Sequence, residues 1–502
     1  MKEKIFLFSS LFVLGCKCGY SQVKPNFLVI VTDDQTYESI HTLNNPEIQT
    51  PNLDRLVRQG TTFTHAFNQG SWSGAVSVAS RSMLITGQHV NKAYKNDVYL
   101  DDWARQKHDD AATAVPLWGE VFQQAGYHTF MTGKWHNSDE ALLKSFSEAR
   151  SVGDGFYESV TADGKKLQYH RGAPTEQWNP SDKIYGGHWN PKVKDIIVKN
   201  GKKEVSDWYT VNRHTSEIYG EEAIHFLQRY SAENPFFMYV AFNAPHDPRQ
   251  SPKRFVEKYP MENLSLPKNF QPLHPFDQGD SKVRDEVLAP FPRTPEAVRL
   301  HRQEYYAIIT HADEVVGRII DELERSGLDK NTYIIFTSDH GLAIGSHGLM
   351  GKQNLYDPTL RVPLIIKGPS VKANRLVDAQ VYMQSIYATT CDLAGIKIPE
   401  TVDFASLLPL LENPDGKGEE YIWGSYKNLQ RIIRSNRFKL LMYPKVKKIQ
   451  LFDIEKDPYE TTNLAGDDAY KKTLKQMFKV MKIKQTEFDD FLDLGKLSDY
   501  SI

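Results

Sequence analysis

A hydroxyl group and a guanidinium group lie four residues apart at the start of an apolar, helix-like stretch of the chain. Ser77 opens this stretch, Arg81 follows, and Thr86 and Gly87 close it. Unpaired backbone N–H groups and the positive end of the helix dipole stabilise an anion at a helix start. An arginine adds a fork of donors that suits sulfate or phosphate oxygens. The stretch indicates an anion site; the alternative is a serine that only caps a helix, beside a surface arginine.

Polar side chains that can bind a metal or move a proton follow apolar segments of strand length. Four such segments cover residues 27–31, 128–131, 236–241 and 333–336. Ligands of open α/β sheets bind at the edge where the carboxyl ends of the strands meet. We therefore expect one site that holds the residues after these segments, which are Asp33, Asp34, Lys134, His136, His246, Asp339, His340 and Lys352.

The aspartates in this set predict a metal site. If Asp33, Asp34 and Asp339 converge, their mutual repulsion prevents all three from staying charged without a partner. A hard divalent cation with oxygen ligands removes that repulsion, and Ca²⁺ or Mg²⁺ fits it better than zinc. The alternative is that the Asp33-Asp34 pair only caps a turn, which is a common position for aspartate.

The lysines and histidines suit the chemistry of an anionic ester. Positive side chains neutralise the ester and the charge that develops on the leaving oxygen. A histidine or lysine within reach can also protonate that oxygen. Taken singly, Lys134, His136, His246 and Lys352 are more consistent with solvated or packed side chains.

The order of the predicted elements favours an α/β fold with helices on both faces of the sheet. Helices are expected from Pro51 to Gly60, over residues 116–126, and over residues 305–323 with an end at Gly327. Residues 251–298 are rich in proline and predict an irregular excursion. Residues 192–205 predict a hairpin with Asn200-Gly201 at its turn.

Length and composition limit the function classes. The 502 residues favour two packed units, with residues 24–398 as the larger domain and residues 399–502 as a smaller C-terminal subdomain. The net charge of −2 gives no sign of nucleic-acid binding. Of three cysteines only Cys391 lies in the folded body, where its apolar surroundings predict a packed thiol.

The N-terminus has the pattern of a secretory signal in residues 1–22. Lys2 and Lys4 precede an apolar run over residues 5–14, which is too short to span a bilayer. Cleavage before Cys16 would give a lipoprotein with a lipid anchor, and cleavage near Ser21 would give a free protein. We therefore expect a secreted protein, either periplasmic or an outer-membrane lipoprotein.

The stretch from Ser77 to Gly87 resembles the motif of the formylglycine-dependent (type I) sulfatases, within the alkaline phosphatase superfamily. That motif reads Cys or Ser, any residue, Pro or Ala, Ser, Arg, and ends in Thr-Gly. Here Ser77, Ala79, Ser80 and Arg81 occupy its core. The resemblance extends from about Pro25 to the end of the chain. It implies a large mixed, mostly parallel sheet flanked by helices, and a C-terminal α+β subdomain with an antiparallel sheet.

The resemblance also implies roles for the site residues. Ser77 would be oxidised to formylglycine, whose hydrate attacks the sulfur of a sulfate ester. The metal, Ca²⁺ rather than Mg²⁺, would be held by Asp33, Asp34, Ser77, Asp339 and His340, where better-known members have asparagine in place of His340. Lys134, His246 and Lys352 would bind sulfate, with His246 or Lys352 as acid. Arg81 would orient the hydrated aldehyde, and His136 would act as base.

Two departures from the common motif affect this prediction. Serine at position 77 requires a maturing enzyme that accepts serine, which in this family is the anaerobic radical enzyme. Ala79 stands where many members have proline. The function expected is a secreted bacterial sulfatase acting on a sulfated carbohydrate. The alternatives are a phosphatase or phosphonate hydrolase of the same superfamily, and an unmatured protein that only binds glycan.

Overall fold

The computed structural model describes most of the chain beyond the predicted signal segment. The described residues are 24–95, 115–155, 159–160, 166–167, 171–173, 178–231 and 233–502. The predicted signal segment and Cys16 lie outside them. Within the described ranges, no helix has both the length and the apolar character needed to cross a membrane.

Five parallel strands form the centre of the main sheet. In spatial order they are β5 (Glu148–Gly153), β4 (His128–Lys134), β12 (Phe236–Ala241), β1 (Asn26–Thr32) and β13 (Thr332–Ser338). Every residue of β1, β12 and β13 is buried, as expected for parallel strands with both faces covered. Four of these five strands are the ones that the sequence predicted to end at the site.

Antiparallel strands extend this centre on both sides, so the sheet is mixed, as predicted. Parallel pairing is confined to the centre and to one outer pair, β16 with β2. The outer strands are β8 (Lys192–Lys194), β11 (Tyr209–Thr210), β15 (Leu364–Lys367), β2 (Thr61–Phe67), β14 (Arg361–Val362) and β16 (Arg375–Tyr382).

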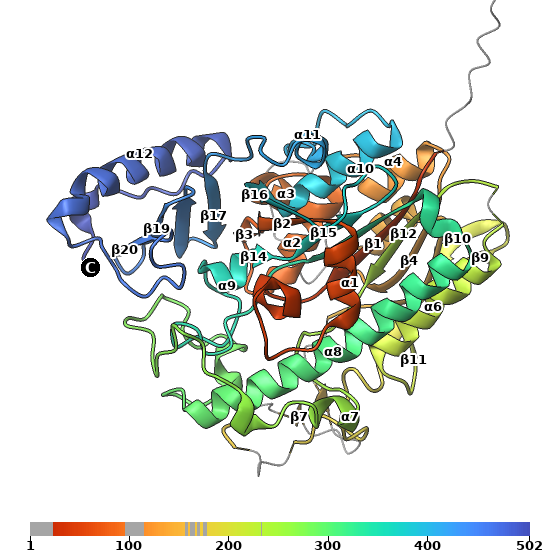
Figure 1. Cartoon of the computed structure of the whole chain (residues 1–502), viewed down its shortest axis with the longest axis horizontal. Helices are drawn as coiled ribbons and strands as arrows, with labels where there is room; N and C mark the ends of the chain where they lie inside the picture. Colours follow the sequence, from red (N-terminus) through yellow and green to blue (C-terminus); the bar gives the residue numbers. More distant parts are fainter. Residues whose placement is uncertain are drawn as a thin grey trace, which may run out of the picture.

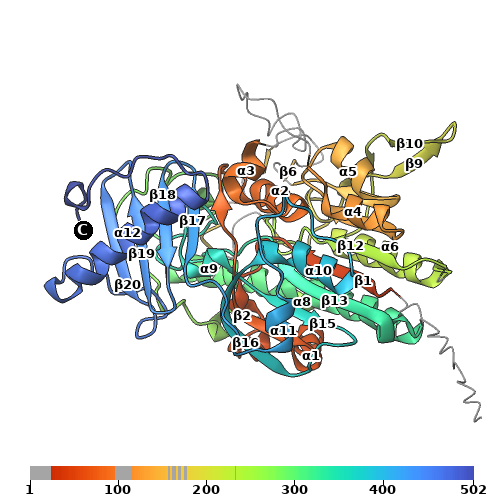
Figure 2. The ribbon, with the colours of Figure 1, turned by 90° about the horizontal axis from the view of Figure 1, so that it is seen from above.

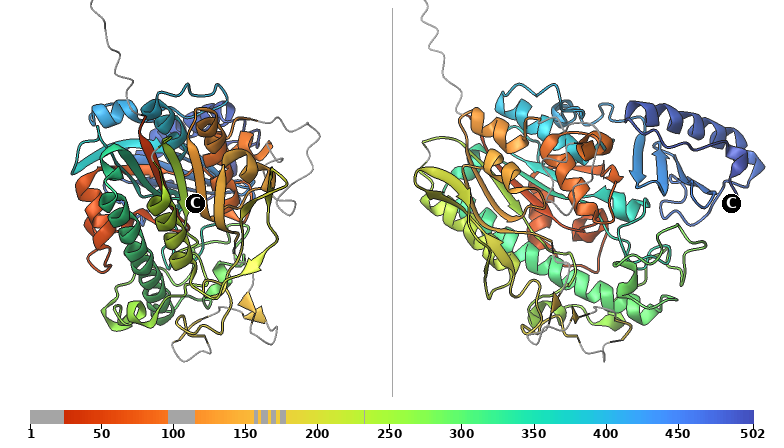
Figure 3. Two further views of the ribbon diagram at one scale, coloured as in Figure 1. Left: turned by 90° about the vertical axis from the view of Figure 1, so that its right-hand side faces the viewer. Right: turned by 180° about the vertical axis from the view of Figure 1, so that it is seen from behind.

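Helices cover both faces of the sheet because the strand residues alternate between two cores. Phe27, Val29 and Val31 of β1 face one core, and Leu28 and Ile30 face the other. The first core is closed by α2 (Val76–Thr86), α4 (Trp118–Gln124) and α10 (Ile386–Ala394). The second is closed by α1 (Pro51–Gln59), α6 (Thr215–Arg229) and α8 (Pro295–Arg325), the long helix along the sheet in Figures 1 and 3.

The long helix begins ten residues before its predicted start. Thr294 caps α8, its side chain accepting a hydrogen bond from the backbone N–H of Ala297, and Pro295 occupies the first turn. The beginning of α8 therefore lies inside the stretch predicted to be irregular. The rest of that stretch contains only short helices, which are α7 (Lys253–Val256), Met261–Asn263 and Glu286–Leu288.

The predicted hairpin is confirmed around its turn but is shorter than expected. β9 (Ile196–Lys199) pairs with β10 (Lys202–Val205), and Asn200 and Gly201 have positive φ angles of 52° and 76°. The first predicted residues instead form β8, which joins the main sheet because Val193 packs into the second core.

The C-terminal part forms a second, antiparallel sheet, as predicted. Its strands are β20 (Lys448–Asp453), β19 (Phe438–Tyr443), β18 (Gln430–Arg434) and β17 (Ile422–Tyr426), and β3 (Gly70–Ser71) of the larger domain joins β17 in parallel. Ile432 faces the larger domain, and the neighbouring Ile433 faces α12 (Lys471–Glu487). Figure 2 shows this helix lying over the sheet.

The segment that leads into the second sheet still belongs to the first core. Leu410 and Leu411 of α11 (Leu408–Glu412) pack there, and so the packing changes between α11 and β17 rather than at residue 399. Cys391 is a buried free thiol, as expected. The remaining elements are α3 (Val90–Lys95), α5 (Asp139–Ser145), α9 (Asp357–Leu360), β6 (Ser159–Val160) and β7 (Lys166–Leu167).

Gly133, one residue before Lys134, provides a test of how tightly the site strands are packed. Its φ angle is 102°, and a Cβ atom there would lie 1.9 Å from the carbonyl oxygen of Ala241 on β12. We expect Gly133→Ala to lower the free energy of unfolding by more than the roughly 1–3 kcal/mol of backbone strain alone.

Gly126→Ala is the matched control for this substitution. Gly126 also has a positive φ angle, 86°, but nothing lies within 4 Å of its added Cβ atom. Denaturant unfolding of both variants measures the difference. An equal loss in the two variants would show that the approach of β4 to β12 is not a constraint.

Candidate active site

Ser77 lies inside the first turn of α2 and does not cap the helix. The N-cap position is Ala75, and α2 ends at Gly87 with a φ angle of 66°. The Ser77 hydroxyl donates to Asp33 Oδ1 at 3.0 Å and lies 3.1 Å from His340 Nε2. Because Arg81 is only 1% exposed, the alternative of a capping serine beside a surface arginine is wrong.

Two neighbouring strands deliver the three aspartates to one point. The backbone N–H of Asp339 bonds to Thr32 O at 3.1 Å, so β1 and β13 end side by side. The backbone N–H of Asp34 then donates to Asp339 Oδ1 at 3.2 Å. Asp33, Asp34 and Asp339 are all fully buried. The predicted convergence of these carboxylates is therefore observed.

Arg81 binds two of these carboxylates at once. Its Nη2 atom lies 3.2 Å from Asp33 Oδ2, and its Nε atom lies 3.2 Å from Asp339 Oδ2. Its Nη1 atom donates to the carbonyl oxygen of Lys134 at 2.9 Å. The guanidinium thus connects α2 to β1, β4 and β13. Lysine could not make these contacts, because it lacks the fixed fork of donors that arginine has.

Two lysines complete the charge balance. Lys134 Nζ pairs with Asp33 Oδ2, and Lys352 Nζ donates to both oxygens of Asp34, at 2.8 and 3.1 Å. Burial would raise the pKa of Asp33, but nearby positive groups, led by Lys134, hold it well below its usual range. Burial raises the pKa of Asp34 well above its usual range, and Lys352 offsets this only in part. The cluster is therefore stabilised by a further positive charge near Asp34.

The spacing of the polar atoms fits a divalent cation. His340 Nε2 lies 3.1 Å from Ser77 Oγ, 3.2 Å from Asp34 Oδ1 and 3.6 Å from Asp339 Oδ1. An ion with bonds of roughly 2.3–2.6 Å places neighbouring ligands roughly 3.2–3.7 Å apart at right angles. Ligand atoms of Asp33, Asp34, Asp339 and His340 all lie within 4.8 Å of one another. These four side chains can hold a metal.

His340 has the protonation state that a metal ligand needs. Its Nδ1 atom lies 2.9 Å from the carbonyl oxygen of Gly341. A carbonyl oxygen only accepts hydrogen bonds, so Nδ1 carries the proton and Nε2 keeps a lone pair toward the carboxylates. Burial also lowers the pKa of His340, which keeps the ring neutral.

His246 follows β12 and lies beside the same carboxylates. One of its ring nitrogens lies within 4.8 Å of a carboxylate oxygen of Asp34. Its Nδ1 atom lies 2.6 Å from the carbonyl oxygen of Asp247, so Nδ1 carries the proton and Nε2 is the nitrogen that can exchange one. Burial, together with the charge of Lys352, lowers the pKa of His246 to about 3.

His136 follows β4 and points its Nε2 atom at a second carboxylate. Nε2 lies 3.2 Å from Asp154 Oδ1, and His136 is 3% exposed. The φ angle of His136 is 60°, a conformation that is uncommon outside glycine and often found at functional sites. Burial, followed by the charge of Lys134, lowers the pKa of His136 well below its usual value.

All the predicted site residues therefore lie in one buried region, and four further charged residues lie beside it. Asp247 pairs with Arg284, whose Nη2 atom is 3.0 Å from Asp247 Oδ1. Asp285 Oδ2 lies 4.0 Å from Lys352 Nζ. No sequence pattern pointed to Arg284 or Asp285, which lie in the irregular excursion. Asp154 follows β5, so the rule used for the other strand ends could have found it.

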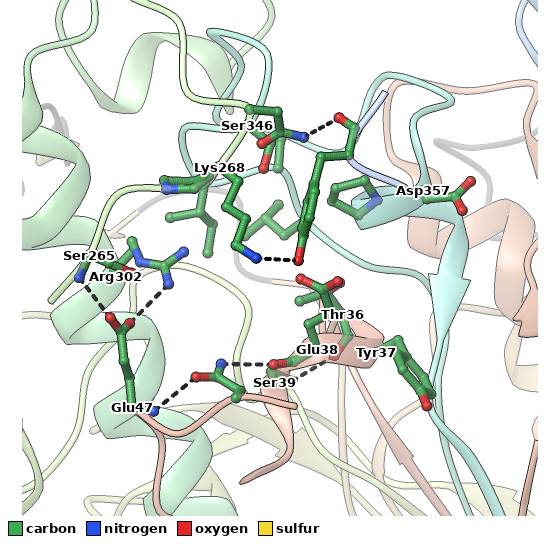
Figure 4. Close-up of a pocket in the computed structure, with 18 of the residues that line it drawn as sticks. Thr36, Tyr37, Glu38, Ser39, Glu47, Ser265, Lys268, Arg302, Ser346 and Asp357 are labelled. Atoms are coloured by element: carbon green, nitrogen blue, oxygen red, sulfur yellow. Dashed lines mark hydrogen bonds and ion pairs between the residues drawn. The ribbon is translucent and has the colours of Figure 1, made fainter. Parts of the chain in front are cut away.

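A separate cavity of about 380 Å³ lies next to the loop that follows β1 and the loop that follows β13 (Figure 4). It is lined by residues just after Asp34 and just after His340, and by Tyr305 and Tyr306 of α8. Of the charged side chains that line it, Glu47 and Arg302 pair with each other, and Lys268 donates to the hydroxyl of Tyr459. The cavity matters to the site through Tyr305, whose hydroxyl donates to the carbonyl oxygen of Asp34 at 2.7 Å and accepts from the backbone N–H of Thr36 at 3.0 Å.

Tyr305→Phe tests whether this hydroxyl supports the metal-ligand turn. Asp34 has a φ angle of 70°, and the Tyr305 hydroxyl stabilises that turn through its hydrogen bonds to the backbone of Asp34 and Thr36. We expect the variant to lose about 1–3 kcal/mol of stability, because it leaves a buried N–H without its partner, and to bind divalent cations more weakly. Tyr306→Phe removes the neighbouring hydroxyl, which contacts Asn45 and Arg302 instead, and should keep its cation affinity. Calorimetric titration that finds equal affinities in the two variants would contradict the role given to Tyr305.

Comparison with known proteins identifies the family. The family model described as "Sulfatase" matches residues 25–396, and the model described as "N-sulphoglucosamine sulphohydrolase, C-terminal" matches residues 345–487. The first match alone covers most of the chain and contains every residue of the site described above.

Relatives and solved structures agree with this match over nearly the whole chain. An arylsulfatase of Clostridium perfringens is 29% identical, with 93% of this chain and 95% of that protein covered. An N-acetylglucosamine-6-O-sulfatase of Bacteroides thetaiotaomicron is 24% identical, with 93% and 87% covered. The structure of BT4656 in complex with its substrate D-glucosamine-2-N,6-O-disulfate has a TM-score of 0.70 at 23% identity, with 94% of this chain and 100% of that one covered. The chain belongs to the sulfatase family.

Proposed function

We propose that the protein hydrolyses a sulfate ester on a sulfated carbohydrate, through a formylglycine made from Ser77, and releases inorganic sulfate. The observation that carries this proposal is the position of the Ser77 hydroxyl. It lies within hydrogen-bond distance of both Asp33 and His340, inside the cluster that can hold a metal. Sulfatase membership itself establishes the class of reaction, and metal-dependent catalysis is what that family implies.

A plain serine does not suit this chemistry. Its hydroxyl has a high pKa, and the sulfate ester that it would form has no easy exit. A hydrated aldehyde at position 77 supplies one hydroxyl that attacks sulfur and a second whose deprotonation expels sulfate and restores the carbonyl. Arg81 orients position 77, because its guanidinium is fixed by Asp33 and Asp339.

The anionic ester is held by Lys134, His246 and Lys352. Lys352 supplies a permanent positive charge, because Asp34 and the other carboxylates raise its pKa above its usual value despite burial. His246 is neutral before substrate binds, since its pKa lies near 3. The negative charge of a bound ester favours its protonated form, so His246 gains a proton when the substrate that needs it is present.

The metal we propose is Ca²⁺, held by Asp33, Asp34, Asp339, His340 and position 77. Three carboxylates and a hydroxyl-type ligand are hard oxygen donors, which Ca²⁺ accepts in a flexible geometry. Mg²⁺ fits less well because it demands a tighter and more regular shell. The imidazole of His340 is a neutral ligand, so it adds no charge to the set.

A carbohydrate substrate and an extracytoplasmic location are supported together. The similarity to the N-acetylglucosamine-6-O-sulfatase and to the complex with a glucosamine disulfate supports a sulfated sugar as the substrate.

The predicted signal segment in residues 1–22 supports secretion to the periplasm or to the outer membrane as a lipoprotein. Serine at position 77 supports maturation by the anaerobic enzyme that accepts serine.

The site geometry disfavours a two-metal phosphatase. Asp34, His246 and Asp247 form a second group that lies close enough to hold a metal. However, Lys352 already binds Asp34, and Arg284 already binds Asp247. Cations of the protein thus occupy the place where a second metal would act, which favours a one-metal sulfatase.

The state of position 77 provides the decisive experiment. We expect protein made with a serine-accepting maturing enzyme to release sulfate from at least one member of a panel of sulfated mono- and oligosaccharides. The peptide that contains position 77 should then be lighter than the serine form by two hydrogens. Protein made without that enzyme should fold and bind metal but release no sulfate.

Two variants serve as controls for this experiment. Ser77→Cys, made in a host whose maturing enzyme accepts cysteine, should restore sulfate release. Ser82→Ala lies on the same buried helix outside the motif core and should keep it. Sulfate release from protein whose position 77 is plain serine by mass spectrometry would contradict the mechanism, and release of phosphate but not sulfate would contradict the function.

Metal removal is the second test. Because only the folded protein binds the ion, Ca²⁺ should raise the melting temperature in a concentration-dependent way. At a hundred times its Kd, the ion should raise the free energy of unfolding by about 2.7 kcal/mol. Asp339→Asn should weaken this effect, whereas Asp321→Asn, at a surface ion pair with Arg55, should not. Absence of a stoichiometric divalent ion from active protein would disprove the site.

A further inference from the structure

Asp154 and His136 form a carboxylate–imidazole pair at the carboxyl ends of two adjacent strands. Val152 and Gly153 of β5 pair in register with Gly133 and Lys134 at the end of β4, and this register brings the two following segments together. Asp154 Oδ1 lies 3.2 Å from His136 Nε2. The pair adjoins the residues to which we assign sulfate binding, because Lys134 lies two residues before His136.

The pairing decides which nitrogen of His136 carries the proton. An ionised carboxylate only accepts hydrogen bonds, so the 3.2 Å contact favours a proton on Nε2. A neutral imidazole has a single N–H, and therefore Nδ1 keeps its lone pair. Burial raises the pKa of Asp154, and the backbone N–H of Gly155, followed by Lys134 and Lys194, acts against this rise.

Asp154 is itself anchored from the other side. Its Oδ1 atom also accepts the backbone N–H of Gly155 at 2.8 Å. Its carbonyl oxygen accepts from Asn243 Nδ2 at 2.9 Å, and Asn243 Oδ1 accepts from the buried Tyr219 hydroxyl at 2.8 Å. The backbone of Asp154 is therefore tied to Asn243 and α6, and its partly exposed carboxylate is held by the Gly155 N–H beside His136.

We propose that Asp154 is a positioning residue for His136, holding the proton on Nε2 so that Nδ1 is the proton acceptor of the site. In the step that needs a base, an O–H bond breaks and an Nδ1–H bond forms. His136 becomes an imidazolium, and the adjacent carboxylate of Asp154 stabilises that charge. This role rests on the proposed sulfate-ester hydrolysis, because that reaction supplies the hydroxyl that loses its proton.

The tautomer of His136 can be measured without turnover. Nitrogen-15 NMR of the full metal-bound chain separates protonated from unprotonated ring nitrogens, and His136→Asn assigns the signal. We expect Nε2–H in the wild type. In Asp154→Asn the amide can donate to Nε2 and favour the Nδ1–H form, so the pattern should reverse wholly or in part. An Nδ1–H tautomer in the wild type, or no change in the variant, would overturn the proposal.

Kinetics provide the second measurement, using matured protein. Asp154→Asn should lower kcat by about 10²–10⁴-fold, the usual contribution of a general base, with a much smaller change in KM. Asp154→Glu, which restores a carboxylate, should recover part of the loss. A change confined to KM, or no loss of kcat, would contradict a role in positioning the base.

The same two strands offer a matched control at the opposite edge of the sheet. Glu148, the first residue of β5, lies 3.5 Å from Nε2 of His128, the first residue of β4. Glu148→Gln removes a carboxylate–histidine pair of the same type far from the site and should leave kcat and the His136 tautomer unchanged. If matured wild-type protein releases no sulfate, the proposed function fails, while the NMR result still decides whether Asp154 sets the tautomer.

Discussion

Three carboxylates without solvent contact form the constraint on which the rest of the structure depends. A buried charge without a partner costs several kcal/mol, so Asp33, Asp34 and Asp339 must each meet a positive group. Arg81, Lys134 and Lys352 provide these groups from a helix, a strand and a loop that are distant in sequence. The catalytic part can therefore fold only with these elements in one arrangement. The surrounding sheet has to be rigid for the same reason.

This charge balance also explains why the site selects an anion. The three carboxylates and the three cations of the protein cancel, so a divalent cation makes the buried cluster positive. An anionic sulfate ester then lowers this excess positive charge in a region where water cannot screen the charges. The raised pKa of Asp34 marks the carboxylate at which a further cation is favoured. The positive charge that the metal adds then favours the anionic substrate.

The sequence predicted the parts of the site that follow regular, apolar strands. β1, β4, β12 and β13 have clear apolar patterns, so the residues after them could be placed at one edge. β5 reads Glu-Ala-Arg-Ser-Val-Gly. These residues lack the apolar pattern of a buried strand, so the strand was not predicted and Asp154 after it was missed. Arg284 and Asp285 come from an irregular segment, where position depends on tertiary contacts alone. β8 was assigned to a hairpin because local turn signals carry no information about pairing with a distant strand.

The two histidines to which we assign proton transfer differ in the group that holds their second nitrogen, and this difference separates the roles that we propose for them. His246 donates from Nδ1 to a neutral carbonyl, and the nearby Asp247 carboxylate is already neutralised by Arg284. His136 instead faces a carboxylate, which stabilises the ring once it has accepted a proton. Asn243 connects both, since its side chain anchors Asp154 and its carbonyl oxygen accepts from the His246 backbone N–H at 2.9 Å. One residue at the end of β12 therefore fixes the spacing between a histidine that suits proton donation and a histidine that suits proton acceptance.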